Sequence, residues 1–457
     1  MVSFTPTRNL SFDDWSHDWA KENRVTLATQ YTERQGTLYR FALVLFVCIL
    51  VLNGTYFRNR EAVAVPTVDW YVLLRAGACG LSFLVGVALL PKKIVWGWGA
   101  KLAMCYVLIA VLSAVTSRYP VPSMGYVTLI LGASSLMLAL VYHARDLADL
   151  ELIQRLWVLT VSALVLKDAV TALFFVEPPS ATGDGRLGMG VTHATELSLF
   201  AALLFWISFG TRTGKLRVIW WLWRAFLLYV IVAAKSRISI LGFVSGGFCY
   251  FIFCTRDFVK RGIVISVTGC LMAFLLLAIT FDQTWAGGMA NYMKRGQDTK
   301  QLASFTGRSY IWRHIAGKVS EAPIKGHGYG VSRLTMGKVP GMNWEPPHCH
   351  NEALEVLFNT GILGFIPFIG MIIYNLKWVW HSSRLQYIFS RTLALHALCL
   401  VVMLLVSFMF EVRLSGKLTP IQPLYFFYLF ALDRAGTFRR LADRPHTDGA
   451  YLGRTAT

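Results

Sequence analysis

The sequence predicts an all-α polytopic membrane protein with about twelve transmembrane helices and one long extracytoplasmic loop. Composition is the first observation, because 55% of the 457 residues are hydrophobic and 15% are charged. Soluble domains carry about 25% charged residues. The second observation is that the apolar residues gather in runs of about 17 to 23, the length that crosses a hydrocarbon core of about 30 Å as a helix. Transmembrane β-strands are about half as long and alternate in polarity, so these runs indicate helices.

Each apolar run is a predicted span, with boundaries uncertain by about four residues. One long apolar stretch, 216–254, exceeds the length of a single crossing, so a helical hairpin is expected there, with its tip at Lys235-Ser236-Arg237. The first run lies behind a polar segment, too far along the chain for a cleavable signal peptide, and is expected to remain as an anchor. The predicted spans are 39–57, 70–90, 100–116, 122–143, 156–176, 191–210, 216–234, 238–254, 263–281, 353–374, 392–412 and 421–433.

Basic residues set the expected orientation. Alternate loops differ in their content of Lys and Arg, and the richer set is expected in the cytoplasm. The N-terminal segment 1–38 and the tail 434–457 then both face the cytoplasm. Helices one to nine occupy 39–281, an outer loop occupies 282–352, and helices ten to twelve occupy 353–433. The formal charge of +19 is explained by these loops, so membrane lipids are expected partners and nucleic acid is not.

Cysteine usage argues against a disulfide framework. Of the eight cysteines, only Cys349 lies in a polar loop, and the others lie in or near apolar runs. His348, Cys349 and His350 are adjacent, but three neighbouring side chains rarely converge on one tetrahedral ion, and no fourth ligand lies at a familiar spacing. We therefore expect no metal site and no cofactor.

The outer loop 282–352 is expected to be ordered. Loops of this length are usually functional or disordered, and this one is too rich in aromatic and apolar residues to be disordered. The segment Ser304–Val319 is expected to form an amphipathic helix that carries Arg308, Trp312 and Ile315 on one side.

His350 lies where this loop re-enters the membrane, just before an apolar helix that Gly361 and Gly364 are expected to interrupt. A neutral imidazole there can accept a proton from a hydroxyl, and a carboxylate such as Glu352 or Glu345 would orient it. The alternative is that His350 is an interfacial residue that caps the next helix. The residues themselves leave both interpretations open.

Three arginines are expected near the outer interface: Arg237 at the hairpin tip, Arg308 on the loop helix and Arg186 in a short outer loop. Guanidinium groups bind phosphate oxygens through two parallel hydrogen bonds, so these residues are candidate ligands for a diphosphate. The alternative for each is contact with lipid headgroups.

Some ionisable residues lie inside apolar runs, where they are costly unless they pair or face a cavity. Lys167 and Asp168 are expected either to form a structural ion pair with another helix or to contact a substrate. Arg75 and Arg224 raise the same question.

The end of the outer loop reads Pro347-His348-Cys349-His350-Asn351-Glu352-Ala353-Leu354, followed by Asn359-Thr360-Gly361-Ile362-Leu363-Gly364. This order resembles the O-antigen ligase and polymerase family, in which His-Asn-x-x-Leu and then Gly-x-x-Gly stand at the exit of a long periplasmic loop. The resemblance extends along most of the chain. Three other segments agree with it: Ser236-Arg237, Thr306-Gly307-Arg308 with Ile311-Trp312, and the turn Gly326-His327-Gly328-Tyr329-Gly330. The segment after His193 departs from the pattern, which leaves a role for that histidine in doubt.

The resemblance implies a GT-C-like glycosyltransferase of the bacterial inner membrane, with a glycan on undecaprenyl diphosphate as donor. By position, Arg237 and Arg308 would bind the donor diphosphate, and His350 would accept the proton of the acceptor hydroxyl during attack on the anomeric carbon. It also implies inversion at that carbon and no metal requirement, because arginines replace the cation. The candidate substrate-binding residues around them are Arg186, His327, His348, Asn351 and Glu352.

The acceptor stays open between another lipid-linked glycan, for a polymerase, and the lipid A core, for a ligase. A polymerase of a surface or exported polysaccharide is preferred, because no segment marks a surface for lipid A. Other polysaccharide-assembly proteins are conceivable partners. A lipid-linked oligosaccharide transporter is the alternative from another class, supported by the ionisable residues within spans. The lack of a visible repeat and the gathering of polar residues in one outer loop count against it.

Overall fold

The described residues form helices joined by loops and turns, and the computed structural model has no strand among them. Seven of the described helices are long and apolar enough to cross a membrane, which identifies a multi-pass membrane protein. The structure describes residues 36–54, 70–91, 96–144, 147–175, 187, 193–210, 217–254, 259, 262–263, 265–266, 307–340, 342, 345–382 and 388–442.

A described helix overlaps each predicted span except 263–281, which lies almost wholly outside the described residues. Three helices extend beyond their predicted spans: α5 begins at Leu147 instead of 156, α14 ends at Ser382 instead of 374, and α16 ends at Ala442 instead of 433. The hairpin predicted within 216–254 is present as α7 and α8, with Lys235 at its tip in a left-handed conformation (φ 47°). After a first helix at Gly36–Gly54, the helices are α2 (Trp70–Leu89), α3 (Trp98–Val115), α4 (Pro120–His143), α5 (Leu147–Phe174), α6 (Ala194–Ile207), the short 3-10 helix η1 (Ser208–Gly210), α7 (Arg217–Ala233), α8 (Arg237–Cys254), α12 (Arg308–Glu321), α13 (Ser332–Thr335), α14 (Glu352–Ser382), α15 (Ile388–Phe408) and α16 (Ile421–Ala442).

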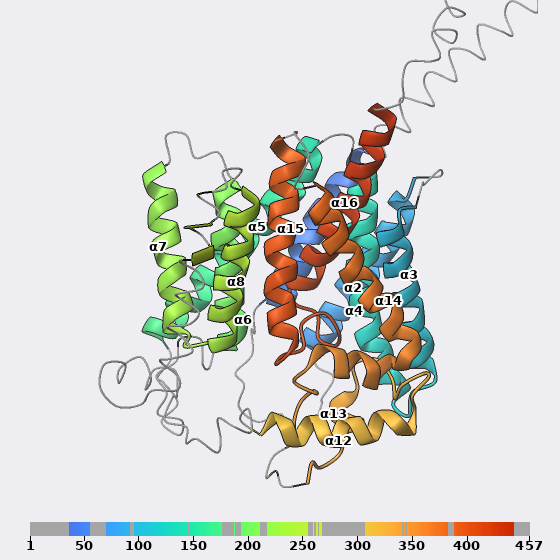
Figure 1. Ribbon diagram of the computed structural model, residues 1–457. Coiled ribbons are helices and arrows are strands. Elements are labelled where there is room, and N and C mark those ends of the chain that lie inside the picture. The colour runs from blue at the N-terminus through green and yellow to red at the C-terminus, as the bar shows by residue number, and fades with distance from the viewer. Residues whose placement is uncertain are drawn as a thin grey trace, which may run out of the picture.

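Helices from the two ends of the chain pack side by side (Figure 1). α14 packs against α3 and α15, α16 packs against α4, and α8 packs against α15. α2 and α4 approach especially closely, because Gly132 lies against the backbone of Cys79 and Gly86 lies against the backbone of Ser135. Small residues at such crossings let helix backbones meet without side chains between them.

The start of α3 is bound by a side chain from the far end of the sequence. Its N-cap residue, Gly97, provides no side-chain cap. The carboxylate of Asp433 in α16 accepts hydrogen bonds from the backbone N–H groups of Gly99 (3.4 Å) and Ala100 (2.9 Å), and from the hydroxyl of Tyr374. Asp433 thus satisfies N–H groups that have no partner within the helix and complements the positive end of the helix dipole.

Helix α14 is broken at Gly361, as its sequence predicts, because this residue takes φ 61° and ψ −165°. The segment after α12 supplies the missing partners: Ile362 N–H donates to the Pro323 carbonyl (2.9 Å) and His327 N–H donates to the Phe358 carbonyl (2.8 Å). The second predicted interruption is wrong, because Gly364 keeps helical geometry and packs on the side chain of Thr360.

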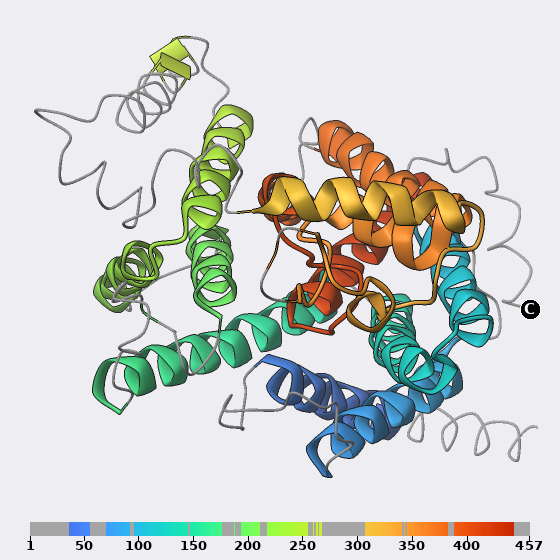
Figure 2. The ribbon, with the colours of Figure 1, turned by 90° about the horizontal axis from the view of Figure 1, so that it is seen from below.

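Helix α12 lies across one end of the bundle, which we call the α12 end (Figures 1 and 2). It corresponds to the helix predicted at 304–319 and begins after Gly307, whose φ of 83° suits a glycine. Ile311 and Ile315 are fully buried in a small apolar cluster with Phe358 of α14. This cluster fixes α12 to the first part of the broken helix α14.

Candidate functional site

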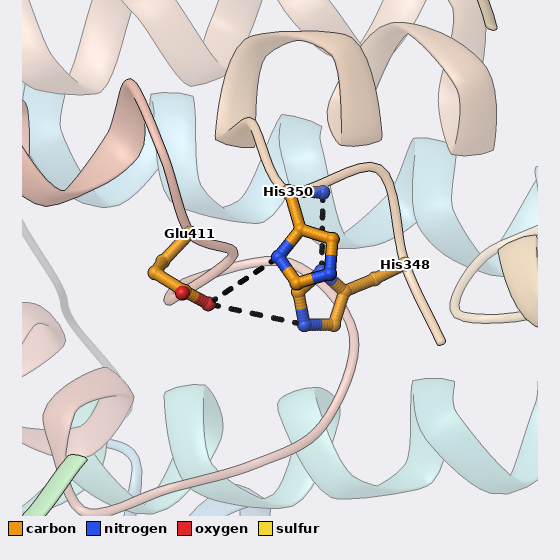
Figure 3. Close-up of side chains that lie close together, drawn as sticks. All are labelled: His348, His350 and Glu411. Atoms are coloured by element: carbon orange, nitrogen blue, oxygen red, sulfur yellow. Dashed lines mark hydrogen bonds and ion pairs between the residues drawn. The ribbon is translucent and has the colours of Figure 1, made fainter. Parts of the chain in front are cut away.

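Three segments that are distant in sequence meet at the α12 end. They are the start of α12, the loop before α14, and the connection between α15 and α16. Figure 3 shows the carboxylate of Glu411, from the connection, facing the rings of His348 and His350 from the loop. Glu411 Oε2 lies 3.8 Å from His350 Nδ1 and 4.0 Å from His348 Nε2, and the centroids of the two rings are 4.1 Å apart.

Arg308 completes the cluster from α12. Its Nη2 lies 2.9 Å from Glu411 Oε1, and its guanidinium stands over the ring of Phe410 at 5.8 Å. The Arg308 side chain is 20% exposed, so it is accessible from outside the protein. Burial lowers the pKa of Arg308 and Glu411 raises it, and a guanidinium keeps its charge at any physiological pH.

Glu411 is a buried anion. Burial alone raises the pKa of Glu411, but the imidazole of His350 and the guanidinium groups of Arg413 and Arg308 outweigh burial and hold that pKa well below its ordinary value. Glu411 is therefore ionised at every physiological pH, and it gives the site one fixed negative charge between two arginines.

The backbone determines which nitrogen of His348 carries a proton. The N–H of His350 donates to His348 Nδ1 (3.1 Å), so Nδ1 is an acceptor and the proton of the neutral ring is on Nε2, which faces Glu411. Burial, followed by the neighbouring His350, lowers the pKa of His348 to about 3. His348 is thus a neutral hydrogen-bond donor at physiological pH.

His350 adopts a left-handed backbone conformation, with φ 51°. A non-glycine residue takes this conformation at a cost, and such strain is concentrated at functional sites. The turn directs Nδ1 toward Glu411 and leaves the side chain 16% exposed. When a carboxylate faces Nδ1 of a histidine, Nε2 is the atom that can accept a proton.

Glu352, a predicted substrate-binding residue, is fully buried at the start of α14. Its carboxylate accepts hydrogen bonds from the backbone N–H groups of Arg413, Leu414 (3.1 Å) and Ser415 (2.6 Å). It therefore holds the segment that carries Glu411, and the carboxylate that faces His350 is Glu411. Glu345, the other carboxylate considered from the sequence, is exposed.

Two other predicted residues make structural contacts. Asn351 caps α14, because its Oδ1 accepts the N–H of Leu354 (3.0 Å), and its amide donates to the Met409 carbonyl (3.3 Å). His327 donates from Nε2 to the Lys318 carbonyl (2.8 Å) and stacks on Phe358 at 4.6 Å. Both contacts tie the loops of the α12 end to the helices.

Arg237 is half-buried at the first turn of α8, and Arg186 lies outside the described residues. A chain of hydrogen bonds connects the start of α8 to the Glu411 segment. Ser239 Oγ donates to the Thr195 carbonyl (3.2 Å), and Arg413 Nη2 donates to Thr195 Oγ1 (3.2 Å).

Sequence reasoning did not single out Glu411, Arg413 or His193 as members of the site. His193 precedes α6, contacts Thr195 Oγ1 through Nδ1 (2.7 Å) and is near enough to lower the pKa of His348. A signal for Glu411 existed, because it falls within the predicted span 392–412, where an ionisable residue is costly without a partner.

The donor atoms of His348, His350 and Glu411 lie within 4.8 Å of one another, as the ligands of a metal ion can. The protonation of His348 does not fit this use, because a ring that accepts the His350 N–H on Nδ1 has its proton on Nε2 and no lone pair there for a metal. Metal-binding histidines instead donate through the second nitrogen. The neighbouring Cys349 is buried and is not part of this group of three residues, and burial raises the pKa of its thiol well above its ordinary value.

Fold and site together define a multi-pass membrane protein that brings two histidines, an arginine and a buried carboxylate together at one end of its bundle. Residues 222–369 match the family model described as O-antigen ligase. This region contains the two histidines, Arg237, Arg308 and Glu352, but not Glu411. The family match and the relatives described next support the O-antigen ligase and polymerase family for this chain.

The relatives carry the name "Putative polysaccharide ligase". The Rickettsia bellii protein is 29% identical over 164 residues, which cover 33% of this chain and 37% of that protein. The Rickettsia felis protein is 26% identical over 195 residues, which cover 40% of this chain and 44% of that protein. The aligned region therefore spans less than half the length of these relatives.

Proposed function

We propose that this protein is a membrane glycosyltransferase of bacterial surface-polysaccharide or exopolysaccharide assembly. It transfers a glycan from an undecaprenyl-diphosphate-linked donor to a sugar hydroxyl on the periplasmic side of the inner membrane. The observation that carries the proposal is the meeting of His350, Glu411 and Arg308 in one partly exposed cluster at the α12 end. The family match supports the same reaction class.

In the proposed reaction, His350 Nε2 takes the proton of the acceptor hydroxyl as its oxygen attacks the anomeric carbon. The bond between that carbon and the diphosphate oxygen breaks, and the electron pair leaves with the diphosphate. Arg308 and Arg237 stabilise the charge that develops on this leaving group. A single displacement of this kind inverts the anomeric carbon. The arginines supply the positive charge, so the proposed mechanism requires no metal.

The proposed reaction has two possible acceptors, which define a polymerase and a ligase. A polymerase extends a second lipid-linked glycan, and a ligase transfers the glycan to the lipid A core. The family description and the names of the relatives use the word ligase but name no acceptor, so the preference for a polymerase stays a prediction that the experiment below decides.

The residues that gave the transporter alternative its support make local contacts. Lys167 pairs with the adjacent Asp168 (2.9 Å). Arg75 donates to Asn53 Oδ1 (2.8 Å), and Arg224 donates to the hydroxyl (2.9 Å) and the carbonyl (2.8 Å) of Ser208 at the end of α6. These contacts give each residue a structural role and favour the transferase.

The proposal is tested in cells that lack the gene, complemented with the wild type, His350→Ala, Arg308→Ala or Arg237→Ala at equal membrane levels. Arg313→Ala is the matched control, because Arg313 is exposed on the same helix as Arg308. Lipid-linked glycan and finished polysaccharide are followed by gel. We expect the three site variants to accumulate lipid-linked glycan on the periplasmic face and the control to behave as the wild type.

The accumulated product identifies the acceptor. Long lipid-linked chains without core-attached glycan indicate a ligase, whereas single repeat units without longer chains indicate a polymerase. Full activity in all three site variants, or lipid-linked units retained on the cytoplasmic face, would contradict the transferase and favour a transporter.

A further inference from the structure

One carboxylate, that of Glu411, serves two different partners in the site. Its Oε1 is bound to Arg308 at 2.9 Å. Its Oε2 is 3.8 Å from His350 Nδ1, longer than the 2.7–3.2 Å of an ordinary N–H···O hydrogen bond. In this arrangement Glu411 is paired tightly with the anion-binding arginine and only loosely with the proposed base.

We propose that Glu411 is a positioning residue that changes partners during the reaction. It holds Arg308 while the donor is absent, and it orients His350 through Nδ1 once the donor diphosphate has replaced it on Arg308. This inference rests on the proposed function. It adds a residue outside the matched family region and an order of events to the mechanism.

The backbone around Glu411 is fixed, so the exchange involves side chains. Glu352 binds three successive N–H groups of the segment, at Arg413, Leu414 and Ser415. The Arg413 side chain is held by Ser407 Oγ (3.0 Å) and Thr195 Oγ1 (3.2 Å). Bringing Oε2 from 3.8 Å to hydrogen-bond distance from His350 requires a shift of about 1 Å, which rotation of the Glu411 side chain provides.

The charges around the cluster favour this exchange. A diphosphate carries more negative charge than one carboxylate and accepts two parallel hydrogen bonds from a guanidinium, so it competes successfully for Arg308. Glu411 remains ionised after release, because Arg413 is still beside it. Among the described residues, the charged and titratable groups that act on Glu411 or His348 are Arg308 from α12, His348 and His350 from the loop, Arg413 from the connection before α16, and His193 before α6. Glu352 of α14 binds the backbone N–H of Arg413.

His348 does not compete with His350 as a base. Its Nδ1 is occupied by the His350 N–H, and its Nε2 carries a proton. Of the two histidines, only His350 can therefore use Glu411 to place a proton on Nδ1, so that the lone pair on Nε2 accepts the proton of the acceptor hydroxyl. The consequence is that the base is oriented for reaction only when a donor is bound.

The test uses the full-length protein in nanodiscs with nitrogen-15-labelled histidine, and inorganic pyrophosphate as the probe. Solid-state NMR reports which ring nitrogen of His350 carries the proton and how strongly that proton is hydrogen-bonded. The signal is assigned by its loss in His350→Asn. In the wild type, we expect pyrophosphate binding to shift the His350 Nδ1 proton downfield, the direction of a stronger hydrogen bond.

Two variants distinguish a shift of the His350 signal that depends on Glu411 from a shift that bound pyrophosphate causes directly. Glu411→Gln should bind pyrophosphate and show at most a small part of the wild-type shift. Arg308→Ala releases Glu411 permanently, so its His350 signal should lie at the shifted position without pyrophosphate. Glu321→Gln, an exposed change on α12, should respond as the wild type.

The outcomes distinguish this inference from the proposed function. A wild-type shift in Glu411→Gln, or an unshifted signal in Arg308→Ala, would overturn the exchange and leave the transferase intact. Absence of pyrophosphate binding to the wild type would overturn both the exchange and the diphosphate-binding role of Arg308. If Glu411→Gln does not fold, the Arg308→Ala signal alone decides the question.

Discussion

His348 is kept neutral by its surroundings, and this neutrality has a thermodynamic cost in acid. Its pKa of about 3 in the folded protein lies below the ordinary value of 6.5. As the pH falls below about 6.5, His348 binds a proton in the unfolded chain but stays neutral in the folded protein. The free energy of unfolding therefore decreases as the pH decreases. Between these two pKa values, the free energy of unfolding falls by up to about 1.4 kcal/mol for each pH unit. The fall ends near the pKa of the folded protein, where the folded His348 also binds the proton.

The substitution His348→Asn tests this expectation. Asparagine keeps an acceptor near the His350 N–H but does not titrate, so the loss of thermal stability between pH 7 and pH 5 should be smaller than in the wild type. The midpoint of thermal unfolding in detergent measures this. Ser320→Ala, an exposed change on α12, should keep the wild-type dependence. An unchanged dependence in His348→Asn would show that other groups cause the acid sensitivity.

At the scale of single residues, the sequence pointed to His350 and Arg308 because they stand in a polar loop between apolar runs. It could not identify Glu411 as their partner, since Arg308 and Glu411 are 103 positions apart and meet only after folding. The expected pairing of His350 with Glu352 came from closeness along the chain. In the folded protein, the helical start of α14 directs Glu352 into the interior, toward the backbone of Arg413.

At the scale of elements, replacement by alanine is expected to destabilise the protein at Gly361 of α14 and to stabilise it at Gly317 of α12. Gly361 has φ 61°, and a Cβ there would overlap the carbonyl of Ile324, so Gly361→Ala meets both backbone strain and a clash. The conformation of Gly361 (φ 61°, ψ −165°) is one that essentially only glycine adopts, and holding another residue in it costs about 1–3 kcal/mol. Gly317 lies within α12 and nothing stands within 4 Å of its Cβ position, so Gly317→Ala should stabilise by about 0.5–1 kcal/mol.

Thermal unfolding of the two variants measures the difference between these positions. Gly361→Ala should unfold at a lower temperature than the wild type, and Gly317→Ala at a higher temperature. Gly361→Ala should also lose activity, because the break in α14 positions the segment that follows α12. A stable, fully active Gly361→Ala protein would contradict the structural role of the break.

Helix positions were predictable because length and hydropathy are local properties of the chain. The break at Gly361 was predictable for the same reason, since glycine tolerates positive φ. The partners that repair the break were not, because the Pro323 carbonyl and the His327 N–H meet Ile362 and Phe358 of α14 only through the tertiary fold.

At the scale of the whole molecule, the proposed reaction requires the α12 end to face the periplasm. Two positions on opposite ends of the bundle test this in a variant without accessible native cysteines. Ser320→Cys lies on exposed α12, and Trp98→Cys lies at the opposite end of the bundle, at the start of α3. A membrane-impermeant maleimide added to spheroplasts should label the first and should label the second only after the cells are opened. The reverse result would contradict the predicted orientation.

The contact between Asp433 and the start of α3 joins parts of the chain that a ribosome makes far apart in time. Ala100 and Asp433 are 333 positions apart, so α3 is synthesised long before the carboxylate that binds its amide groups exists. Until α16 arrives, water or lipid headgroups must satisfy those N–H groups. A nascent chain that ends before Asp433 therefore lacks the bond that joins α3 to α16, and it presents membrane proteases with an incompletely packed bundle.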